Sequence, residues 1–284
     1  MIVHAADVWK TFGRVHALQG LNLTIPEGSA FALVGANGAG KTTTIKTLMN
    51  ILQPTRGTLT VLGADSRRLS PRELSDIGYV SENQEMPSRM SVGSFIDYLR
   101  PFYPRWDRAL ETELRHRLAL PTNRTIKDLS HGMRMKLSLA CALPFRPRLL
   151  VLDEPLGALD PLVRDEFIES LRPQIGDTTL LISSHELTEI ESFTTHLAYV
   201  DRGAVVFQEA LPDLQNRVRS VRVTLTTGDV VSFVDTNFSE DNVTARVEGR
   251  FGRVDHIETS RVPLRSIFTT VARAMRTDAG AHDQ

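Results

Sequence analysis

A glycine-rich loop that ends in a lysine and a threonine is the clearest candidate for chemistry in this sequence. Residues 35–42 read Gly-Ala-Asn-Gly-Ala-Gly-Lys-Thr and match the spacing G-x-x-x-x-G-K-[ST]. Such a loop lets backbone N–H groups and a helix N-terminus surround a phosphate chain. Lys41 supplies a positive charge to the β- and γ-phosphates, and the Thr42 hydroxyl is a ligand for Mg²⁺. The predicted nucleotide contacts are Gly35, Asn37, Gly38, Ala39, Gly40, Lys41, Thr42 and Thr43.

Two adjacent carboxylates end an apolar segment further along the chain. Residues 149–152 are Leu-Leu-Val-Leu, and Asp153 and Glu154 follow directly. A buried strand with this ending would bring Asp153 beside the phosphates, where it holds Mg²⁺ through water. Glu154 would then orient and deprotonate the attacking water. The guanine-binding pattern Asn-Lys-x-Asp is absent from the sequence, so we do not expect a GTPase.

Short apolar runs bounded by glycine, proline or aspartate indicate the strands that would position these residues. We expect buried strands at residues 30–34, 149–152, 179–183 and 197–200. We expect helices between them at residues 41–52, 72–75, 92–98, 106–118, 130–143 and 164–171. This alternation predicts an α/β core with a mostly parallel sheet and flanking helices.

The two ends of the chain have residue patterns that differ from the α/β core. Residues 2–8 and 21–25 alternate polar and apolar side chains, which predicts an antiparallel β layer beside the core. From residue 216 onward we expect a small α+β module. Its predicted strands are residues 221–225, 230–234, 244–247 and 253–257, with turns at Gly228 and Gly249. Its predicted helix carries Leu264, Ile267, Phe268, Val271 and Met275 at helical spacing.

Composition excludes several classes of protein. The 284 residues include 33 Lys and Arg against 34 Asp and Glu, so the basic excess of a nucleic-acid binder is missing. The single cysteine, Cys141, excludes an internal disulfide framework and a cysteine-rich zinc site. The densest apolar stretches, residues 30–36 and 137–143, are far shorter than the roughly 20 residues of a membrane-spanning helix. The first ten residues lack the pattern of a secretory signal.

A third motif lies between the phosphate loop and the paired carboxylates. Residues 129–133 read Leu-Ser-His-Gly-Met and open a predicted helix with Ser130 as its N-cap. Met133, Leu137, Ala140 and Cys141 follow at i, i+4, i+7 and i+8, which predicts the buried stripe of that helix. With the other motifs in the same order, residues 1–215 resemble the ATPases of ATP-binding cassette (ABC) transporters, whose signature is Leu-Ser-Gly-Gly-Gln. His131 replaces the first glycine of that signature and Met133 its glutamine.

The resemblance implies roles for further residues. Phe12 corresponds to the aromatic residue that stacks on adenine, and Gln84 to the glutamine that contacts Mg²⁺ and the attacking water. Asp160 ends a Gly-Ala-Leu-Asp loop that crosses to the partner subunit, and His185 matches the histidine that hydrogen-bonds the γ-phosphate. The retained signature residues that face the γ-phosphate are Ser130 and Gly132.

The resemblance also predicts the organisation of the protein. Residues 1–215 would form a P-loop NTPase core, with the antiparallel layer and an inserted helical subdomain at residues 86–145, and residues 216–284 an accessory module. Two copies would form a homodimer with ATP and Mg²⁺ at the interface. The dimer would hydrolyse ATP to ADP and phosphate, on the cytoplasmic face of the membrane, for separately encoded permease subunits and without nucleic acid.

Finer similarity points to the bacterial ABC-2-type exporters. It is carried by the segments Phe-Tyr-Pro-Arg-Trp-Asp at 102–107 and Asp-Pro-Leu-Val-Arg-Asp at 160–165. Phe102, Tyr103 and Trp106 either line the groove that receives a helix of the membrane subunit or pack within the helical subdomain.

Two other functions stay open at this point. One is a soluble ABC ATPase acting on ribosomes or DNA, and the other is a regulatory partner with poor hydrolysis, against which Glu154 speaks.

Overall fold

The computed structural model describes residues 1–157, 159–175, 177–186, 188, 190–264, 266–268 and 270. Contacts divide the chain into two compact units, Met1–Gln208 and Glu209–Gln284. This division falls a few residues before the boundary expected after residue 215.

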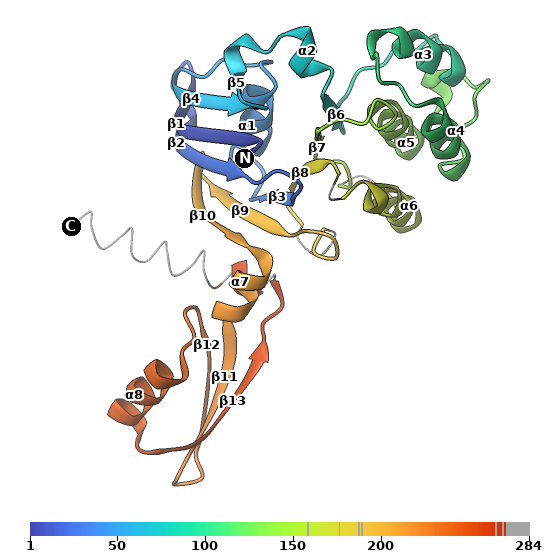
Figure 1. The fold of residues 1–284 in the computed structure, drawn as a ribbon. Helices are drawn as coiled ribbons and strands as arrows, with labels where there is room; N and C mark the ends of the chain where they lie inside the picture. The colour runs from blue at the N-terminus through green and yellow to red at the C-terminus, as the bar shows by residue number, and fades with distance from the viewer. Residues whose placement is uncertain are drawn as a thin grey trace. The chain divides into compact units, whose positions relative to one another are not determined.

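A mostly parallel sheet forms the centre of the first unit, with the strand order β10-β9-β3-β8-β7-β6 (Figure 1). Its strands are β3 (Ala30–Val34), β6 (Ile77–Ser81), β7 (Leu149–Asp153), β8 (Thr179–Ser184), β9 (His196–Asp201) and β10 (Ala204–Ala210). The β3–β8, β3–β9, β6–β7 and β7–β8 pairs are parallel. Every residue of β3, β7 and β8 is buried, as expected for strands covered on both faces. The predicted α/β core and its four strands are confirmed, whereas β10 was not predicted as a strand.

An antiparallel layer accompanies this sheet, also as predicted. Its strands are β1 (Val3–Phe12), β2 (Val15–Ile25), β4 (Arg56–Val61) and β5 (Ala64–Asp65), in the order β2-β1-β4-β5. Leu18, Leu23 and Ile25 from β2 join Phe31 of β3 and Ile45 in one buried apolar cluster. This cluster joins the antiparallel layer to the strand that leads into the phosphate loop.

Helices connect the strands of the first unit. They are α1 (Lys41–Leu48), α2 (Pro71–Leu74), α3 (Val92–Leu99), α4 (Arg108–Arg117), α5 (His131–Ala142) and α6 (Pro161–Leu171). Helix α1 ends earlier than predicted because Asn50 adopts a left-handed conformation with φ 57°. The prediction that α5 buries a single stripe of side chains is wrong. Residues 135–142 are buried on all sides and Met133 only in part, because other elements surround this helix.

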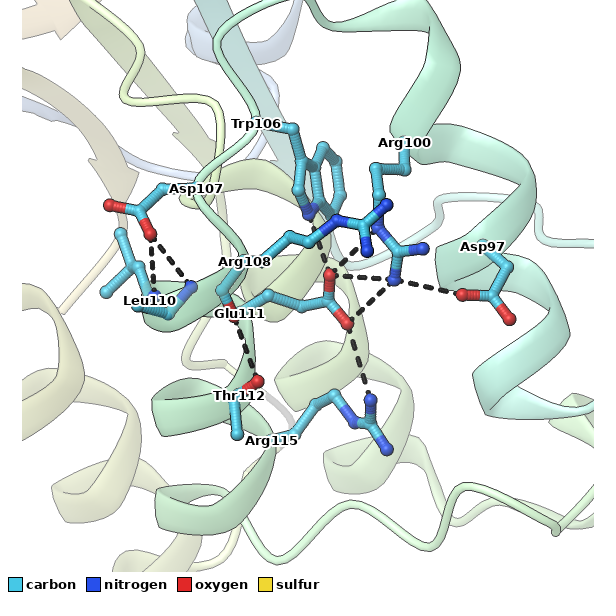
Figure 2. Close-up of polar contacts among 10 residues, drawn as sticks. Asp97, Arg100, Trp106, Asp107, Arg108, Leu110, Glu111, Thr112 and Arg115 are labelled. Atoms are coloured by element: carbon cyan, nitrogen blue, oxygen red, sulfur yellow. Dashed lines mark hydrogen bonds and ion pairs between the residues drawn. The ribbon is translucent and has the colours of Figure 1, made fainter.

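A buried carboxylate holds the helical subdomain together between α3 and α4. The Glu111 side chain is 3% exposed and accepts hydrogen bonds from both Arg100 Nε at 3.1 Å and Trp106 Nε1 at 2.8 Å. Arg115 makes a further ion pair with it at 3.3 Å (Figure 2). Trp106 is therefore committed to packing within this subdomain, as is Tyr103, which stacks on Phe145 with ring centroids 4.0 Å apart.

The second unit is a small α+β module, as predicted. It consists of α7 (Leu211–Arg217), β11 (Arg219–Leu225), β12 (Val230–Asp235), α8 (Glu240–Phe251) and β13 (Val254–Arg261), with sheet order β12-β11-β13 (Figure 1). The strand predicted at residues 244–247 is wrong. This segment and Gly249 lie inside α8, because Val243 and Val247 occur one helical turn apart and face the buried cluster with Val221 and Val223.

The remaining predictions for this module have mixed outcomes. Gly228 lies in the turn between β11 and β12 with φ 88°, as predicted. Leu264, Ile267 and Phe268 are helical and buried. Val271 and Met275 lie outside the described residues. Among the described residues, no helix has both the length and the apolar character needed to cross a membrane.

Candidate functional site

The phosphate loop connects β3 directly to α1. Gly35 follows β3 so closely that a Cβ atom there would lie 2.3 Å from the carbonyl oxygen of Val200 on β9. Gly40 caps α1 in a left-handed conformation with φ 111°, which side chains other than glycine rarely adopt. Both glycines are therefore required by the backbone path, and the N-terminus of α1 points its free N–H groups toward the loop.

Lys41 is held at the start of α1 by the loop itself and by a carboxylate. Its side chain is 5% exposed, and Nζ donates to the carbonyl oxygens of Gly35 at 2.7 Å and Ala36 at 3.2 Å. The same Nζ lies 3.0 Å from Glu154 Oε1 as an ion pair. The lysine therefore lies between the loop that would hold phosphate and the carboxylate predicted to act as the base.

Asp153 ends β7 and is almost completely buried. Thr42 Oγ1 donates to its Oδ1 at 3.1 Å, and Ser183 Oγ donates to the same oxygen at 2.8 Å. Burial raises the pKa of Asp153, and these two hydrogen bonds oppose the rise. A pocket of about 320 Å³ opens beside it and is lined by Thr42, Gln84, Asp153 and Glu154 among others. A hydroxyl, an amide and carboxylates around one pocket are the oxygen donors that suit Mg²⁺.

Glu154 has a strained backbone and two polar side-chain partners, Lys41 and His185. Its φ is 49°, an uncommon conformation for a residue other than glycine. His185 Nδ1 lies 2.9 Å from its Oε2, while Lys41 pairs with Oε1. Burial acts to raise the pKa of Glu154, but the contacts with His185 and Lys41 outweigh it and leave this pKa below its ordinary value. The carboxylate is thus kept ionised, as a general base must be.

Ser183 was not singled out from the sequence, yet it connects both carboxylate residues. Its hydroxyl donates to Asp153 and accepts the backbone N–H of Glu154 at 2.9 Å. The residue is fully buried on β8 and is paired in register with Asp153 on β7. A serine at the end of an apolar strand was the available signal, but the strand pairing was needed to interpret it.

The remaining predicted residues lie at loops and helix starts. Ser130 caps α5 by accepting from Met133 N, and Asp160 caps α6 by accepting from Val163 N at 3.1 Å. Gly132 packs against Val163, and a Cβ atom at Gly157 would lie 3.5 Å from His185. Phe12 is 45% exposed at the end of β1, with Lys10 Nζ 4.9 Å from its ring centroid. The structure thus brings Lys41, Thr42, Gln84, Asp153, Glu154 and His185 together within one chain.

Comparison with known proteins agrees with this geometry. The sequence model of the ABC transporter family matches residues 18–157. The ABC transporter ATP-binding protein YhaQ of Bacillus subtilis is 31% identical over 81% of this chain and 78% of its own length. The chain belongs to the ABC transporter ATP-binding proteins. ABC ATPases of this kind bind and hydrolyse ATP, so the predicted enzyme class is confirmed.

Other relatives of this ABC ATPase carry more specific names. The daunorubicin resistance ATP-binding protein DrrA2 of Streptomyces coeruleorubidus is 33% identical over 78% of this chain and 70% of its own. The bacitracin transport ATP-binding protein BcrA of Enterococcus faecalis is 29% identical over 77% and 72%. The name of BcrA assigns that relative to transport, and the alternative of a non-transport ATPase gains no support.

Solved structures show the same fold. An ATP-binding subunit of an ABC transporter superposes with a TM-score of 0.69 at 23% identity, over 76% of this chain and 92% of that one. A dimeric ATP-binding cassette bound to ADP and Pi superposes with a TM-score of 0.65 at 23% identity, over 74% and 99%. The predicted P-loop NTPase core is confirmed at the level of fold.

Proposed function

We propose that this ABC ATPase works as a homodimer that encloses two ATP molecules between its copies. In each site one copy contributes the phosphate loop, Gln84, Asp153, Glu154 and His185, with Phe12 against adenine. The other copy contributes Ser130, Gly132 and Asp160. A symmetric arrangement of this kind uses the same surfaces on both copies, as a twofold dimer requires. The dimeric cassette among the fold neighbours supports this assignment.

The side chains around Glu154 have distinct tasks in the proposed hydrolysis. Lys41 neutralises β- and γ-phosphate charge, for which its Nζ leaves Glu154 and contacts a phosphate oxygen instead. Glu154 then accepts a proton from the attacking water, and His185 keeps its carboxylate oriented from 2.9 Å. Ser183 fixes the backbone of Glu154 and the carboxylate of Asp153 in one relative position.

The donor set also fits a divalent cation. Asp153 is a buried carboxylate whose pKa is raised by burial, so a positive charge beside it would relieve a real electrostatic cost. We propose that Thr42, Gln84 and Asp153 hold Mg²⁺, which when bound neutralises charge on the transferred phosphate. The protein residues would hold that positive charge in a fixed position beside the phosphate loop.

The chain of side-chain contacts from Lys41 through Glu154 to His185 is the observation that carries this function. Glu154→Gln should keep ATP binding, slow turnover by about 10²–10⁴-fold and accumulate an ATP-bound dimer, because the base is lost while the phosphate loop and Lys41 are kept. Lys41→Ala should instead weaken ATP binding itself. Size-exclusion chromatography with ATP and Mg²⁺ and binding of a fluorescent nucleotide measure the two effects. A Glu154→Gln protein that stays monomeric and turns over ATP at the wild-type rate would contradict the assignment.

We further propose that the ATPase powers export through separate membrane subunits at the cytoplasmic face of the membrane. The names of the relatives BcrA and DrrA2 support this direction. A groove of about 300 Å³ between α2 and the helical subdomain is lined by Arg72, Tyr103, Arg105 and Phe145 among others. Phe102 directly precedes Tyr103, which lines this groove, and Phe102 is 61% exposed. The ring of Tyr98 packs edge-on against the ring of Phe102. We assign this surface to the membrane subunit.

Membrane recovery tests the assignment. Phe102→Glu should release the protein from native membranes while ATP turnover in solution is kept, because Phe102 lies outside the ATP site. Phe251→Glu is the matched control, since Phe251 is also an exposed phenylalanine but lies in the second unit. Equal membrane recovery of both variants would remove Phe102 from this role.

The division into an ATPase domain at 1–215, its helical subdomain at 86–145 and an accessory module at 216–284 stays a prediction.

A further inference from the structure

An ion pair with one buried partner joins the signature helix α5 to helix α6, which follows the loop that ends in Asp160. Lys136 on α5 pairs with Glu166 on α6. The Lys136 side chain is 10% exposed, whereas the Glu166 side chain is 41% exposed. Neither residue belongs to the ATP site described above, so the chemistry proposed there does not explain the pair.

We propose that Lys136 and Glu166 are positioning residues that set Ser130 and Asp160 at the matched positions needed to engage the partner's ATP. The inference rests on the proposed homodimer. It adds that one ion pair aligns the signature helix, capped by Ser130, with the loop that ends in Asp160, which are the two elements that one copy presents to the other. Lys136 and Glu166 act through these elements and touch no reacting atom.

The position of the pair along both helices supports this role. Lys136 is the sixth residue of α5, which begins at His131, and Glu166 is the sixth residue of α6, which begins at Pro161. A helix rises 1.5 Å per residue, so the pair lies about 7.5 Å along each axis from the first residue. Linking equivalent positions keeps the two helix N-termini level with each other, and Ser130 and Asp160 are the caps of those N-termini.

A second contact restricts the same two helices close to their ends. A Cβ atom at Gly132 would lie 3.1 Å from Val163 Cγ1 and 3.7 Å from Leu159 Cδ2, so α5 and α6 touch at their first turns. The backbone N–H of Val163 is also the donor to the Asp160 side chain. The loop at Asp160 and the signature helix thus share Val163 as a neighbour, and the ion pair prevents the helices from sliding about this contact.

The burial of Lys136 favours the pairing. A charged ammonium group removed from water is costly unless an opposite charge faces it. Moving α5 along α6 would separate Lys136 from Glu166 and leave the ammonium buried without its partner. The pair therefore favours one relative placement of the two helices.

The test measures dimer affinity and nucleotide affinity separately, in the Glu154→Gln background, which stops hydrolysis. Lys136→Met removes the charge and keeps most of the side-chain length, and Glu166→Gln removes the partner at a more exposed position where folding is less at risk. Each should weaken the ATP-dependent dimer by about tenfold, the order expected for residues that share a contact network. Affinity of the monomer for a fluorescent ATP analogue should stay unchanged, because the phosphate loop acts in its own chain.

Three comparisons make the outcome specific. Lys136→Arg should retain the dimer, because it retains the ion pair. Lys136→Met should cost nothing further in a Glu166→Gln protein, because the interaction is already lost. Lys127→Met, at an exposed lysine nearby, should behave as the parent. The inference is overturned if Lys136→Met and Glu166→Gln dimerise with parental affinity, or if fluorescent-nucleotide affinity falls as much as dimer affinity. A Glu154→Gln parent that never dimerises would overturn the homodimer itself, and the inference with it.

Discussion

At the scale of single residues, the site is organised around two carboxylates with opposite environments. Asp153 is buried with neutral hydroxyl donors, whereas Glu154 lies between Lys41 and His185. The first environment raises the pKa of a carboxyl group and the second lowers it. The Ser183 side chain hydrogen-bonds to both residues.

Ser183→Ala should lower ATP turnover by about tenfold or more while ATP affinity changes little. The substitution removes the donor to Asp153 and leaves the N–H of Glu154 without its acceptor, and losses of supporting hydrogen bonds at such sites are of this order. Steady-state kinetics and fluorescent-nucleotide binding check it. Ser170→Ala is the control, because Ser170 is equally buried but bonds only within α6. Similar turnover in the two variants would show that the Ser183 bridge is dispensable.

Asp153→Asn should abolish productive turnover and yet raise the thermal midpoint of the protein without nucleotide or metal. The folded state binds the Asp153 proton more tightly than the unfolded state, because burial raises this pKa. The ionised group therefore costs folding stability at neutral pH, and that cost disappears as pH falls through the raised pKa. The Asn variant should be more stable than wild type at pH 7, by a margin that narrows on acidification. Calorimetry in a chelating buffer measures both, and a less stable Asn variant at pH 7 would contradict this balance.

At the scale of elements, the helical subdomain depends on polar contacts as well as on apolar packing. Arg100, Trp106 and Arg115 all point to Glu111 on α4 (Figure 2). These residues come from three consecutive segments, so one carboxylate sets the corner between α3 and α4. That corner carries the exposed Tyr98 and Phe102 assigned to the membrane subunit.

Glu111→Gln should lower the free energy of unfolding by about 2–3 kcal/mol. Breaking a buried ion pair costs more than a surface pair, but Arg100 and Arg115 are 23% and 34% exposed and regain some hydration. Urea denaturation measures the loss, and hydrogen exchange should show it concentrated in α3 and α4. Glu113→Gln is the control, because Glu113 pairs with Arg117 at the surface. Equal effects at the two positions would show that Glu111 has no special structural role.

At the scale of the whole molecule, the chain has two compact units with separate apolar cores. The cluster of Val221, Val223, Leu225, Val243 and Val247 belongs to the second unit, whereas the phosphate loop belongs to the first. Separate cores allow separate unfolding transitions, since each unit buries its own apolar surface.

Leu225→Ala should destabilise the second unit by about 2–5 kcal/mol, because it leaves a cavity in a small core. Calorimetry should show one transition moved to lower temperature and another unchanged, and ATP affinity should stay at the wild-type value. Val230→Ala, at a 53% exposed position on β12, should move neither transition. A single transition that shifts as a whole would show that the two units unfold together.

The sequence by itself determined the parts of this protein whose geometry is local. The phosphate loop needs glycine at Gly35 and Gly40 and a lysine at the first residue of the helix, so eight consecutive residues identify it. Short, mostly apolar runs identified β3, β7 and β8, because strands covered on both faces leave few other choices. The order of these motifs along the chain was enough to indicate the family.

Only the tertiary structure decided which distant side chains meet. Ser183 reaches Asp153 because parallel pairing of β7 and β8 places the two in register, and Lys136 reaches Glu166 because α5 and α6 pack together. The segment at 244–247 is helical because the sheet of the second unit offers its apolar face to Val243 and Val247, although its β-branched residues alone favour a strand. Strand register and helix packing arise from the summed burial of many residues, so no single short pattern in the sequence encodes them.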